Sequence, residues 1–432
     1  MEKNMRLILF ATICLTLLTG VHAEEEAGGE DQARYRALAT FASVLQMIHD
    51  RYIDSDKATY DRLIQAAIKG MLQDLDNYTG YESIEQHKES IRVLGGETVG
   101  VGLVVNKISN TPLEVITPLE GSPAEAAGIR PGSLILEING EKTAPLSMRE
   151  CLKLIQGKPD TKVKLMVKYK EDASYEVSLP RKNIAFGSIP PHGVKVIDGD
   201  IGYIRIMVFS SHTAADFDRA VRKLQKQGIK SLIIDLRNNP GGLLNSAVDL
   251  ASRLLKPDSV ILYTSSRDSE DHKEETITSY KTAKAIDFGI PVILLVNSLS
   301  ASASEILAGA LMDNKRAVSI GSRTFGKATV QNIQELPDGS AIRLTIGRYL
   351  TPSRKPIQGL GIAPNITVEV PHAERIPFYS QLAIYPGIIK PDTPNALTDE
   401  ALAKAVEQLK KPAPAPKPKP VEKAKPAEKE KA

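Results

Sequence analysis

Apolar residues recur at helical spacing in the first part of the chain. One stripe consists of Phe41, Val44, Leu45 and Ile48, and a second of Leu63, Ile64, Ala67, Ile68, Met71 and Leu72. Apolar side chains three and four residues apart share one face of a helix. The pattern therefore predicts a helical N-terminal region over residues 31–93.

The next stretch, residues 94–183, changes to short β-type runs separated by Gly and Pro turns. The runs are Val101 to Val105, Leu113 to Ile116, Leu134 to Ile138, Val163 to Tyr169 and Tyr175 to Leu179. Short apolar runs bounded by turn-forming residues are typical of strands. We expect a compact, mostly β domain here.

From residue 184 to residue 375, strand-like apolar runs alternate with helical stretches. The runs are Ile201 to Ile206, Ser231 to Asp235, Val292 to Val296 and Ala317 to Ile320, and the helical stretches are Ala214 to Gln227, Asn245 to Leu255 and Ser304 to Met312. This alternation predicts βαβ units around a largely parallel sheet. The fold class is therefore α/β and multidomain, with a helical extension over residues 376–410 after the core.

The two ends of the chain have their own patterns. Residues 1–23 combine basic Lys3 and Arg6, an apolar run and a small-x-small site ending at Ala23, which predicts an export signal cleaved after that residue. The apolar run is shorter than a spanning helix needs, although an uncleaved anchor stays open. Residues 411–432 are almost entirely Pro, Lys, Ala and Glu, so we expect a disordered tail, either a spacer or a segment that binds cell wall or lipid.

Composition narrows the function. The chain has 55 basic and 52 acidic residues, a balance that gives no indication of a nucleic-acid partner. Cys14 lies inside the apolar run after bulky Ile13, which argues against lipidation, and Cys151 alone remains in the mature chain, so no intramolecular disulfide can form. No His or Cys pair has metal-ligand spacing, and we expect neither metal nor cofactor.

A candidate nucleophile lies where a predicted buried strand gives way to a helix. The segment Asn297-Ser-Leu-Ser-Ala-Ser302-Ala-Ser304-Glu-Ile places a serine at this turn, near the backbone N–H groups of the helix start. The structural alternative is a small-residue segment that packs closely, with Ser304 as the helix N-cap. This stretch alone does not separate the two.

A lysine in the next turn favours the chemical interpretation. Lys327 lies in Arg-Thr-Phe-Gly-Lys-Ala-Thr-Val-Gln331, between two β-type runs. A lone lysine is usually a solvated cation, but a lysine whose pKa is lowered by burial can take a proton from a serine hydroxyl. Gln331, further along the same predicted strand, could hold the lysine nitrogen.

These segments resemble the Ser/Lys dyad of the carboxyl-terminal processing peptidases, the PDZ-containing family S41. The resemblance extends from about Phe41 to Val370 and implies that Ser302 is the nucleophile, that Lys327 is its base and that Gln331 is the partner of the lysine. It also implies a ClpP/crotonase-like architecture for the protease core.

The glycine pair in Asp235-Leu-Arg-Asn-Asn-Pro-Gly241-Gly242 ends another predicted buried strand. By resemblance, the N–H of Gly241 or Gly242 and that of Ala303 would form the oxyanion hole that acyl transfer needs. The structural alternative is a tight turn before a helix.

Two glycine-rich segments of the β domain resemble a PDZ domain. They are Gly100-Val101-Gly102-Leu103 and the stretch from Gly121 to Gly140. Successive N–H groups of the first turn could accept a terminal carboxylate while a peptide adds to the sheet edge. A β domain used only for packing is the alternative.

The resulting hypothesis is an exported serine endopeptidase of a bacterial periplasm or cell envelope, which cleaves proteins near their C-termini and recognises their tails through its PDZ domain. We expect protein or peptide substrates with free C-termini and a homo-oligomer. An activating adaptor and peripheral membrane association stay open. The alternatives are an inactive PDZ scaffold in the envelope, a crotonase-type enzyme acting on acyl thioesters, and a triad with His212 as the base.

Overall fold

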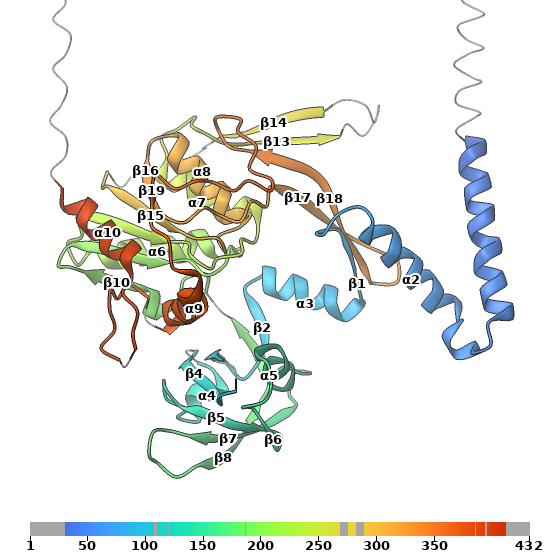
Figure 1. The fold of residues 1–432 in the computed structure, drawn as a ribbon, viewed down its shortest axis with the longest axis horizontal. Helices are drawn as coiled ribbons and strands as arrows, with labels where there is room; N and C mark the ends of the chain where they lie inside the picture. Colours follow the sequence, from blue (N-terminus) through green and yellow to red (C-terminus); the bar gives the residue numbers. More distant parts are fainter. Residues whose placement is uncertain are drawn as a thin grey trace, which may run out of the picture. The chain divides into compact units, whose positions relative to one another are not determined.

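The computed structural model describes residues 31–107, 110–119, 121–185, 187–267, 275–281, 289–384, 386–393 and 395–411 (Figure 1). The predicted export signal and almost all of the Pro/Lys-rich tail lie outside these residues. The chain divides into two compact units. The smaller consists of the chain up to Tyr81 together with Ile342–Leu344, and the larger begins at Glu82 and contains the rest.

The smaller unit is helical, as its apolar stripes predict. It contains a helix over residues 31–51, the 3-10 turn η1 (Ser55–Lys57) and helix α2 (Tyr60–Gln73), and strand β1 (Gly80–Glu82) follows at its boundary. The His49 ring stacks on the Tyr60 ring at 4.1 Å between centroids. Phe41 and Val44 of the first stripe are exposed. No helix of the described residues is both long and apolar enough to cross a membrane.

The larger unit begins with helix α3 (Ile84–Leu94), whose N-terminus carries a reciprocal cap. The Gln86 N–H donates to the Ser83 hydroxyl, while the Gln86 side chain accepts the Ser83 N–H at 2.9 Å. Strand β2 (Glu97–Gly100) then pairs antiparallel with β9 (Lys182–Ala185). The β domain lies between these two strands in the sequence.

This β domain forms one sheet in the order β3-β4-β5-β7-β8, with β6 added to β5. Its elements are β3 (Leu103–Asn106), β4 (Leu113–Pro118), α4 (Pro123–Ala126), β5 (Leu134–Ile138), β6 (Glu141–Lys142), α5 (Met148–Ile155), β7 (Lys162–Lys168) and β8 (Tyr175–Pro180). The strands fall where the short β-type runs predict them. Cys151 on α5 is fully buried in the domain core, and burial raises the pKa of its thiol.

The α/β core has a six-stranded sheet in the order β10-β11-β12-β15-β16-β19, parallel except for β10. Its strands are β10 (Val194–Ile197), β11 (Ile201–Arg205), β12 (Ser231–Asp235), β15 (Val292–Val296), β16 (Ala317–Gly321) and β19 (Ile366–Thr367), and η2 (Pro191–Gly193) precedes them. The largely parallel sheet predicted from the alternating pattern is confirmed.

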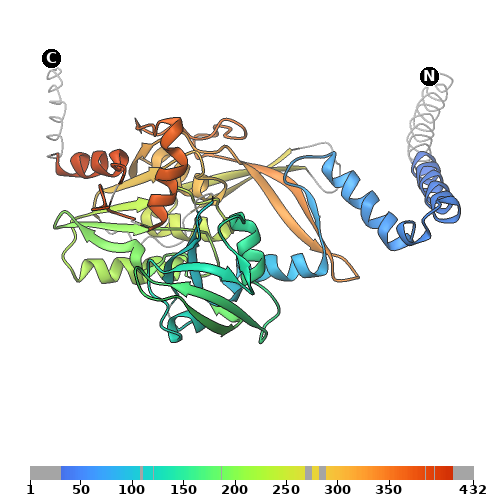
Figure 2. The same ribbon diagram turned by 60° about the horizontal axis from the view of Figure 1, so that its bottom comes forward.

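Successive residues of the central strands point to opposite faces of this sheet, and each face has its own helices. Ile234 and Leu294 pack in the cluster that includes α6 (Thr213–Gln225), α7 (Leu244–Leu254) and α8 (Ala303–Asp313). Ile233 and Leu295 pack in a second cluster with α10 (Glu400–Lys410). The C-terminal helix therefore covers the face opposite to α8. The red segment of Figure 2 also contains η3 (His372–Glu374) and α9 (Arg375–Ile384).

A second sheet was not predicted from the sequence. Strand β13 (Val260–Arg267) pairs antiparallel with β14 (Glu275–Lys281) and with β18 (Ala341–Leu350), which also pairs with β17 (Thr329–Glu335). Strand β17 carries Gln331 and β18 carries Tyr349, so this sheet supplies side chains to the site described next.

Candidate active site

Ser302 occupies a strained turn between β15 and α8. Its φ of 55° and ψ of −116° lie in a region that residues with a side chain rarely adopt. Ser302 is the N-cap residue of α8, whereas Ser304 is fully buried and its hydroxyl donates to the Asn239 carbonyl at 3.0 Å. The alternative in which Ser304 caps the helix is therefore wrong. Among the described serines only Ser302 has a positive φ, and it is the serine that the sequence singled out as a nucleophile.

Lys327 lies just before β17, and its side-chain nitrogen is hydrogen-bonded to a residue of that strand. The lysine Nζ donates to Gln331 Oε1 at 3.2 Å. The side chains of Lys327 and Gln331 are both half-buried. Lys327 follows Gly326, whose φ of 91° and close packing against Gly361 leave no room for a Cβ atom.

The Glu305 carboxylate ties the serine segment to the lysine segment. One of its oxygens, Oε2, accepts the backbone N–H of Ser302 at 2.9 Å and the backbone N–H of Lys327 at 2.9 Å. Because both lie 2.9 Å from the same oxygen, the backbone nitrogens of Ser302 and Lys327 are at most twice 2.9 Å apart. The other oxygen accepts the Gly326 N–H at 2.8 Å and the Thr324 hydroxyl at 2.5 Å.

This carboxylate is fully buried, and the four groups that donate to it are uncharged, namely three backbone N–H groups and one hydroxyl. Burial raises its pKa, while the hydrogen bonds from Thr324, Lys327, Gly326 and Ser302 oppose the rise. Four donors around one buried carboxylate fix its position and, through it, the positions of both chain segments.

Tyr349 joins the same two residues through their carbonyl groups. Its hydroxyl lies 2.9 Å from the Ser302 carbonyl oxygen and 2.5 Å from the Lys327 carbonyl oxygen. Tyr349 is 2% exposed, and burial together with the Glu305 charge holds its pKa well above the ordinary value. The hydroxyl is therefore a neutral donor over the working pH range.

Sequence reasoning assigned no role to Glu305 or Tyr349. A signal for Glu305 was present, because a Ser followed three residues later by Glu at a helix start is the pattern of a capping box. No local signal exists for Tyr349, which reaches the site from β18 and is 47 residues from Ser302 in the sequence.

Gly241 of the predicted oxyanion loop lies against the serine turn, and Gly242, the next residue, lies against Phe209. A methyl group on Gly241 would stand 2.7 Å from Ser302 Cβ and 2.9 Å from the Ala303 nitrogen, and one on Gly242 would stand 2.0 Å from the Phe209 oxygen. Both glycines have positive φ, 103° and 143°. The structure thus brings Gly241 together with Ser302 and Ala303, and Gly242 follows directly in the chain. Only glycine fits at positions 241 and 242.

The N–H groups of this loop differ in their partners. The Gly241 N–H donates to Asn239 Oδ1 at 2.9 Å. The N–H groups of Gly242 and Ala303, in contrast, have no backbone acceptor among the described residues. Asn239 also accepts the Ala301 N–H on its carbonyl oxygen at 3.0 Å, which fastens the loop to the serine turn.

The predicted tail-binding turn lies between β2 and β3. Gly102 has a φ of 76° and packs against Ser122, while Val101 is 1% exposed and contributes its side chain to the core of the β domain. Strand β3, which begins at Leu103, pairs only with β4 among the described strands and so lies at the sheet edge. Such an edge can accept an added strand.

No group of three or more His, Cys, Asp or Glu side chains among the described residues could hold a metal ion. His212, the histidine considered as a base, is the N-cap residue of α6.

Comparison with known proteins agrees with this arrangement. Residues 200–368 match peptidase family S41, and residues 114–168 match a PDZ domain. A "Probable CtpA-like serine protease" of Staphylococcus aureus (strain N315) is 35% identical over 366 residues, 83% of this chain and 70% of that protein. A carboxy-terminal-processing protease of Bartonella bacilliformis is 31% identical over 386 residues, 87% of this chain and 85% of that protein.

A solved structure described as a "Putative S41 protease from Bacteroides fragilis NCTC 9343" has the same fold. It superposes with a TM-score of 0.53 at 18% identity, over 85% of this chain and 96% of that chain.

A PDZ domain followed by an α/β core with this serine turn defines a serine-type peptidase that acts on proteins. The chain belongs to peptidase family S41, together with the bacterial carboxy-terminal-processing proteases. The resemblance inferred from the sequence and the α/β multidomain fold class are both confirmed.

Proposed function

We propose that this chain is an exported endopeptidase that cleaves proteins near their C-termini, with Ser302 as nucleophile and Lys327 as general base. The observation that carries the proposal is the shared oxygen of Glu305, which binds the backbone N–H groups of both residues at 2.9 Å. Gln331 Oε1 accepts a hydrogen bond from the lysine Nζ at 3.2 Å.

In the acylation step, neutral Lys327 Nζ takes the Ser302 hydroxyl proton as Oγ bonds to the scissile carbonyl carbon. This step requires the uncharged form of the lysine amine. The N–H groups of Gly242 and Ala303 receive the oxyanion, and Gly241 could join them only by leaving Asn239. The C–N bond then breaks, and the lysine returns its proton to the leaving amine.

In the deacylation step, water attacks the acyl ester while Lys327 takes one of its protons. The ester bond breaks, the new carboxyl group leaves, and the proton returns to Ser302 Oγ. No metal or cofactor enters either step.

We also propose that the PDZ domain binds substrate tails at the Gly100–Leu103 turn, with the peptide adding to the edge of β3. A side-chain variant in this turn would disturb the core, because Val101 and Gly102 are closely packed. The peptide should be varied instead. Binding of an apolar tail peptide to Ser302→Ala that is abolished by amidating the peptide C-terminus supports carboxylate recognition, and equal binding of both peptides argues against it.

Export is tested by expressing the full chain in a bacterium and determining the N-terminus of the protein from the envelope fraction. A chain that begins at Glu24 supports cleavage after Ala23. A chain that retains residues 1–23 and sediments with membranes indicates an anchor instead. Sedimentation velocity of the same preparation tests the expected homo-oligomer.

Activity is tested with the full chain and an unfolded protein that has an apolar C-terminus. Ser302→Ala and Lys327→Ala should both abolish cleavage, while Ser298→Ala in the same loop and Lys355→Ala on the surface should not. Wild-type activity should rise with pH as the lysine loses its proton. If all variants and the wild type are inert but the tail peptide still binds, the inactive PDZ scaffold is the better account.

A further inference from the structure

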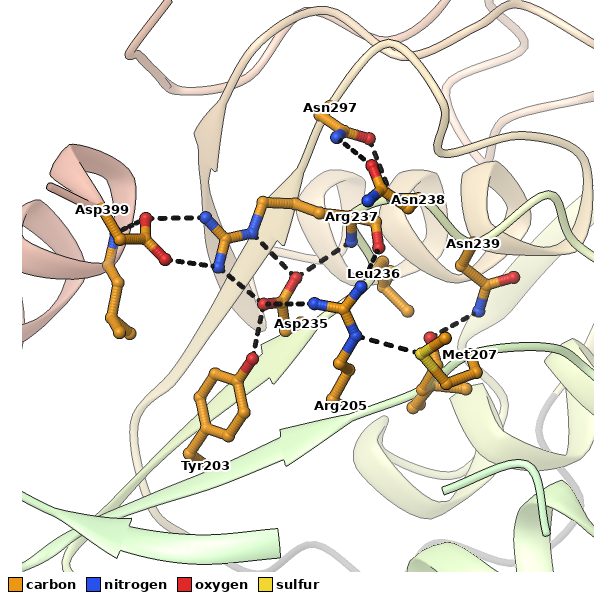
Figure 3. A network of polar contacts seen from close by, with 12 residues as sticks. Tyr203, Arg205, Met207, Asp235, Leu236, Arg237, Asn238, Asn239, Asn297 and Asp399 are labelled. Atoms are coloured by element: carbon orange, nitrogen blue, oxygen red, sulfur yellow. Dashed lines mark hydrogen bonds and ion pairs between the residues drawn. The ribbon is translucent and has the colours of Figure 1, made fainter. Parts of the chain in front are cut away.

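A buried ion cluster lies at the end of strand β12, and Figure 3 shows its side chains. The loop that leads to Gly241 and Gly242 begins there. Asp235 is the last residue of strand β12, and Arg237 lies at the start of the loop that follows. Asp399 is the residue just before helix α10. All three side chains are at most 2% exposed. Asp399 is 162 residues from Arg237 in the sequence and lies outside residues 200–368.

Arg237 is held by paired hydrogen bonds on both sides. Its two terminal nitrogens donate to Asp399 Oδ1 at 2.7 Å and to Asp399 Oδ2 at 2.8 Å. Toward Asp235, Nε donates at 2.9 Å, Nη2 at 2.7 Å and the backbone N–H at 3.0 Å. Such fork geometry fixes the orientation of the guanidinium group as well as its position.

Tyr203 and Arg205 complete the cluster. The Tyr203 hydroxyl donates to Asp235 Oδ2 at 2.6 Å, and Arg205 lies 3.8 Å from the same oxygen. Burial alone would raise the pKa of Asp235, but the charge and hydrogen bonds of Arg237 hold it below the ordinary value. The two aspartates and two arginines balance in charge, so the loss of one leaves a buried charge without its partner.

The loop that begins at this cluster is hydrogen-bonded to the serine turn. Asn239 is two residues after Arg237, and its carbonyl oxygen accepts the Ala301 N–H at 3.0 Å. The Asn239 side chain accepts the Gly241 N–H at 2.9 Å. A displacement of Arg237 is therefore transmitted over a few bonds to the residue beside Ser302 and to the glycine pair.

Helix α10 anchors Asp399 to the sheet. The Asp399 carboxylate accepts the Leu402 N–H at 3.0 Å, so it caps the helix as well as binding Arg237. Leu402 is fully buried in the cluster with Tyr203 and Ile233, on the sheet face opposite to α8. The helix thus presents a fixed carboxylate to the base of the loop.

We propose that Asp399 is a positioning residue for catalysis, through which the C-terminal helix α10 sets the geometry of the loop that supplies the oxyanion donor. The inference rests on the proposed function, in which the N–H groups of Gly242 and Ala303 stabilise the transition state. In this proposal helix α10 contributes to catalysis by holding the loop in place through Asp399.

The test compares two variants of the full chain that both act on α10. Asp399→Asn keeps the size of the side chain and an oxygen that can cap the helix, but removes the charge and one of the two oxygens that Asp399 offers to Arg237. Leu402→Ala removes buried contacts of the helix and leaves the Arg237 pair intact. Melting temperature, kcat and KM for peptide cleavage are measured for both, well below the melting temperatures.

Asp399→Asn should lower kcat by about 10- to 100-fold with KM within about twofold of wild type, because a displaced donor weakens transition-state binding and leaves peptide binding unchanged. Leu402→Ala should lower the melting temperature while keeping kcat within about twofold. A kcat for Asp399→Asn within twofold of wild type overturns the inference. Equal loss of kcat in both variants also overturns it, because the helix would then act only through stability.

Arg237→Lys decides the question if Asp399→Asn does not fold. Lysine keeps the charge but cannot bind both carboxylates through paired bonds, so the same loss of kcat is expected, and an unchanged kcat overturns the inference. Ser302→Ala is measured in parallel. If it remains active, the proposed nucleophile is wrong, whereas an inert Ser302→Ala with a fully active Asp399→Asn rejects only the role of Asp399.

Discussion

Replacing Glu305 by glutamine tests whether one buried carboxylate holds the two proposed catalytic segments together. The change keeps the length of the side chain but removes the charge and replaces one oxygen by an NH2 group. In the native site each oxygen accepts two donors, from Ser302 and Lys327 on one side and from Gly326 and Thr324 on the other. The amide nitrogen must face one of these pairs in either orientation.

The magnitude follows from the count of donors. At least one buried N–H group loses its acceptor, and the remaining bonds lose the assistance of a charge, so we expect the free energy of unfolding to fall by about 2–4 kcal/mol. Because the serine and lysine segments would no longer share a fixed acceptor, kcat should fall by about 100-fold.

Urea unfolding followed by circular dichroism measures the stability, in a Ser302→Ala background that prevents self-digestion. Peptide cleavage by the single Glu305→Gln variant measures kcat. Glu335→Gln on β17 is the matched control, because its carboxylate is 66% exposed and the same change there should alter stability by less than about 0.5 kcal/mol. A Glu305→Gln chain as stable and active as this control would refute the reasoning.

Three further predictions concern Tyr349, Gly241 and Asp235. Tyr349→Phe removes the hydroxyl between the Ser302 and Lys327 carbonyl oxygens and should lower the free energy of unfolding by about 1–3 kcal/mol, measured in urea; no change would show that the hydroxyl is dispensable. Gly241→Ala places a methyl group 2.7 Å from Ser302 Cβ and should abolish peptide cleavage, so an active variant would contradict the packing described. The pKa of Asp235 is below its ordinary 3.8 in the folded chain, so its contribution to stability is present above pH 3.8 and is lost as pH falls through the lower folded value. Thermal melts should show a shallower decline below pH 3.8 for Asp235→Asn than for wild type, and parallel curves would count against the assignment.

The α/β core was predictable because its signals are local. Strand β12 was predicted with its observed bounds, Ser231–Asp235, since a short run buried on both faces and ended by a turn has a distinctive pattern. The serine and lysine segments were identified by their motifs and spacing.

The parts that escaped prediction depend on contacts between distant segments. Tyr349 is an ordinary strand residue in the sequence, and its function in the site arises from the pairing of β18 with β13 and β17. Asp399 likewise looks like a helix cap, and only the packing of α10 on the sheet brings it to Arg237. The occupation of the Gly241 N–H by Asn239 also emerges only from the folded chain, because the sequence left both glycines as candidates.

The most direct test of the central claim is the site and rate of labelling by a fluorophosphonate, read by mass spectrometry of the full chain and its fragments. The account predicts one adduct on Ser302, formed faster as pH rises through the lysine titration, and no adduct above background in Lys327→Ala. An adduct on another residue, or equal labelling rates in wild type and Lys327→Ala, would contradict the Ser302/Lys327 mechanism.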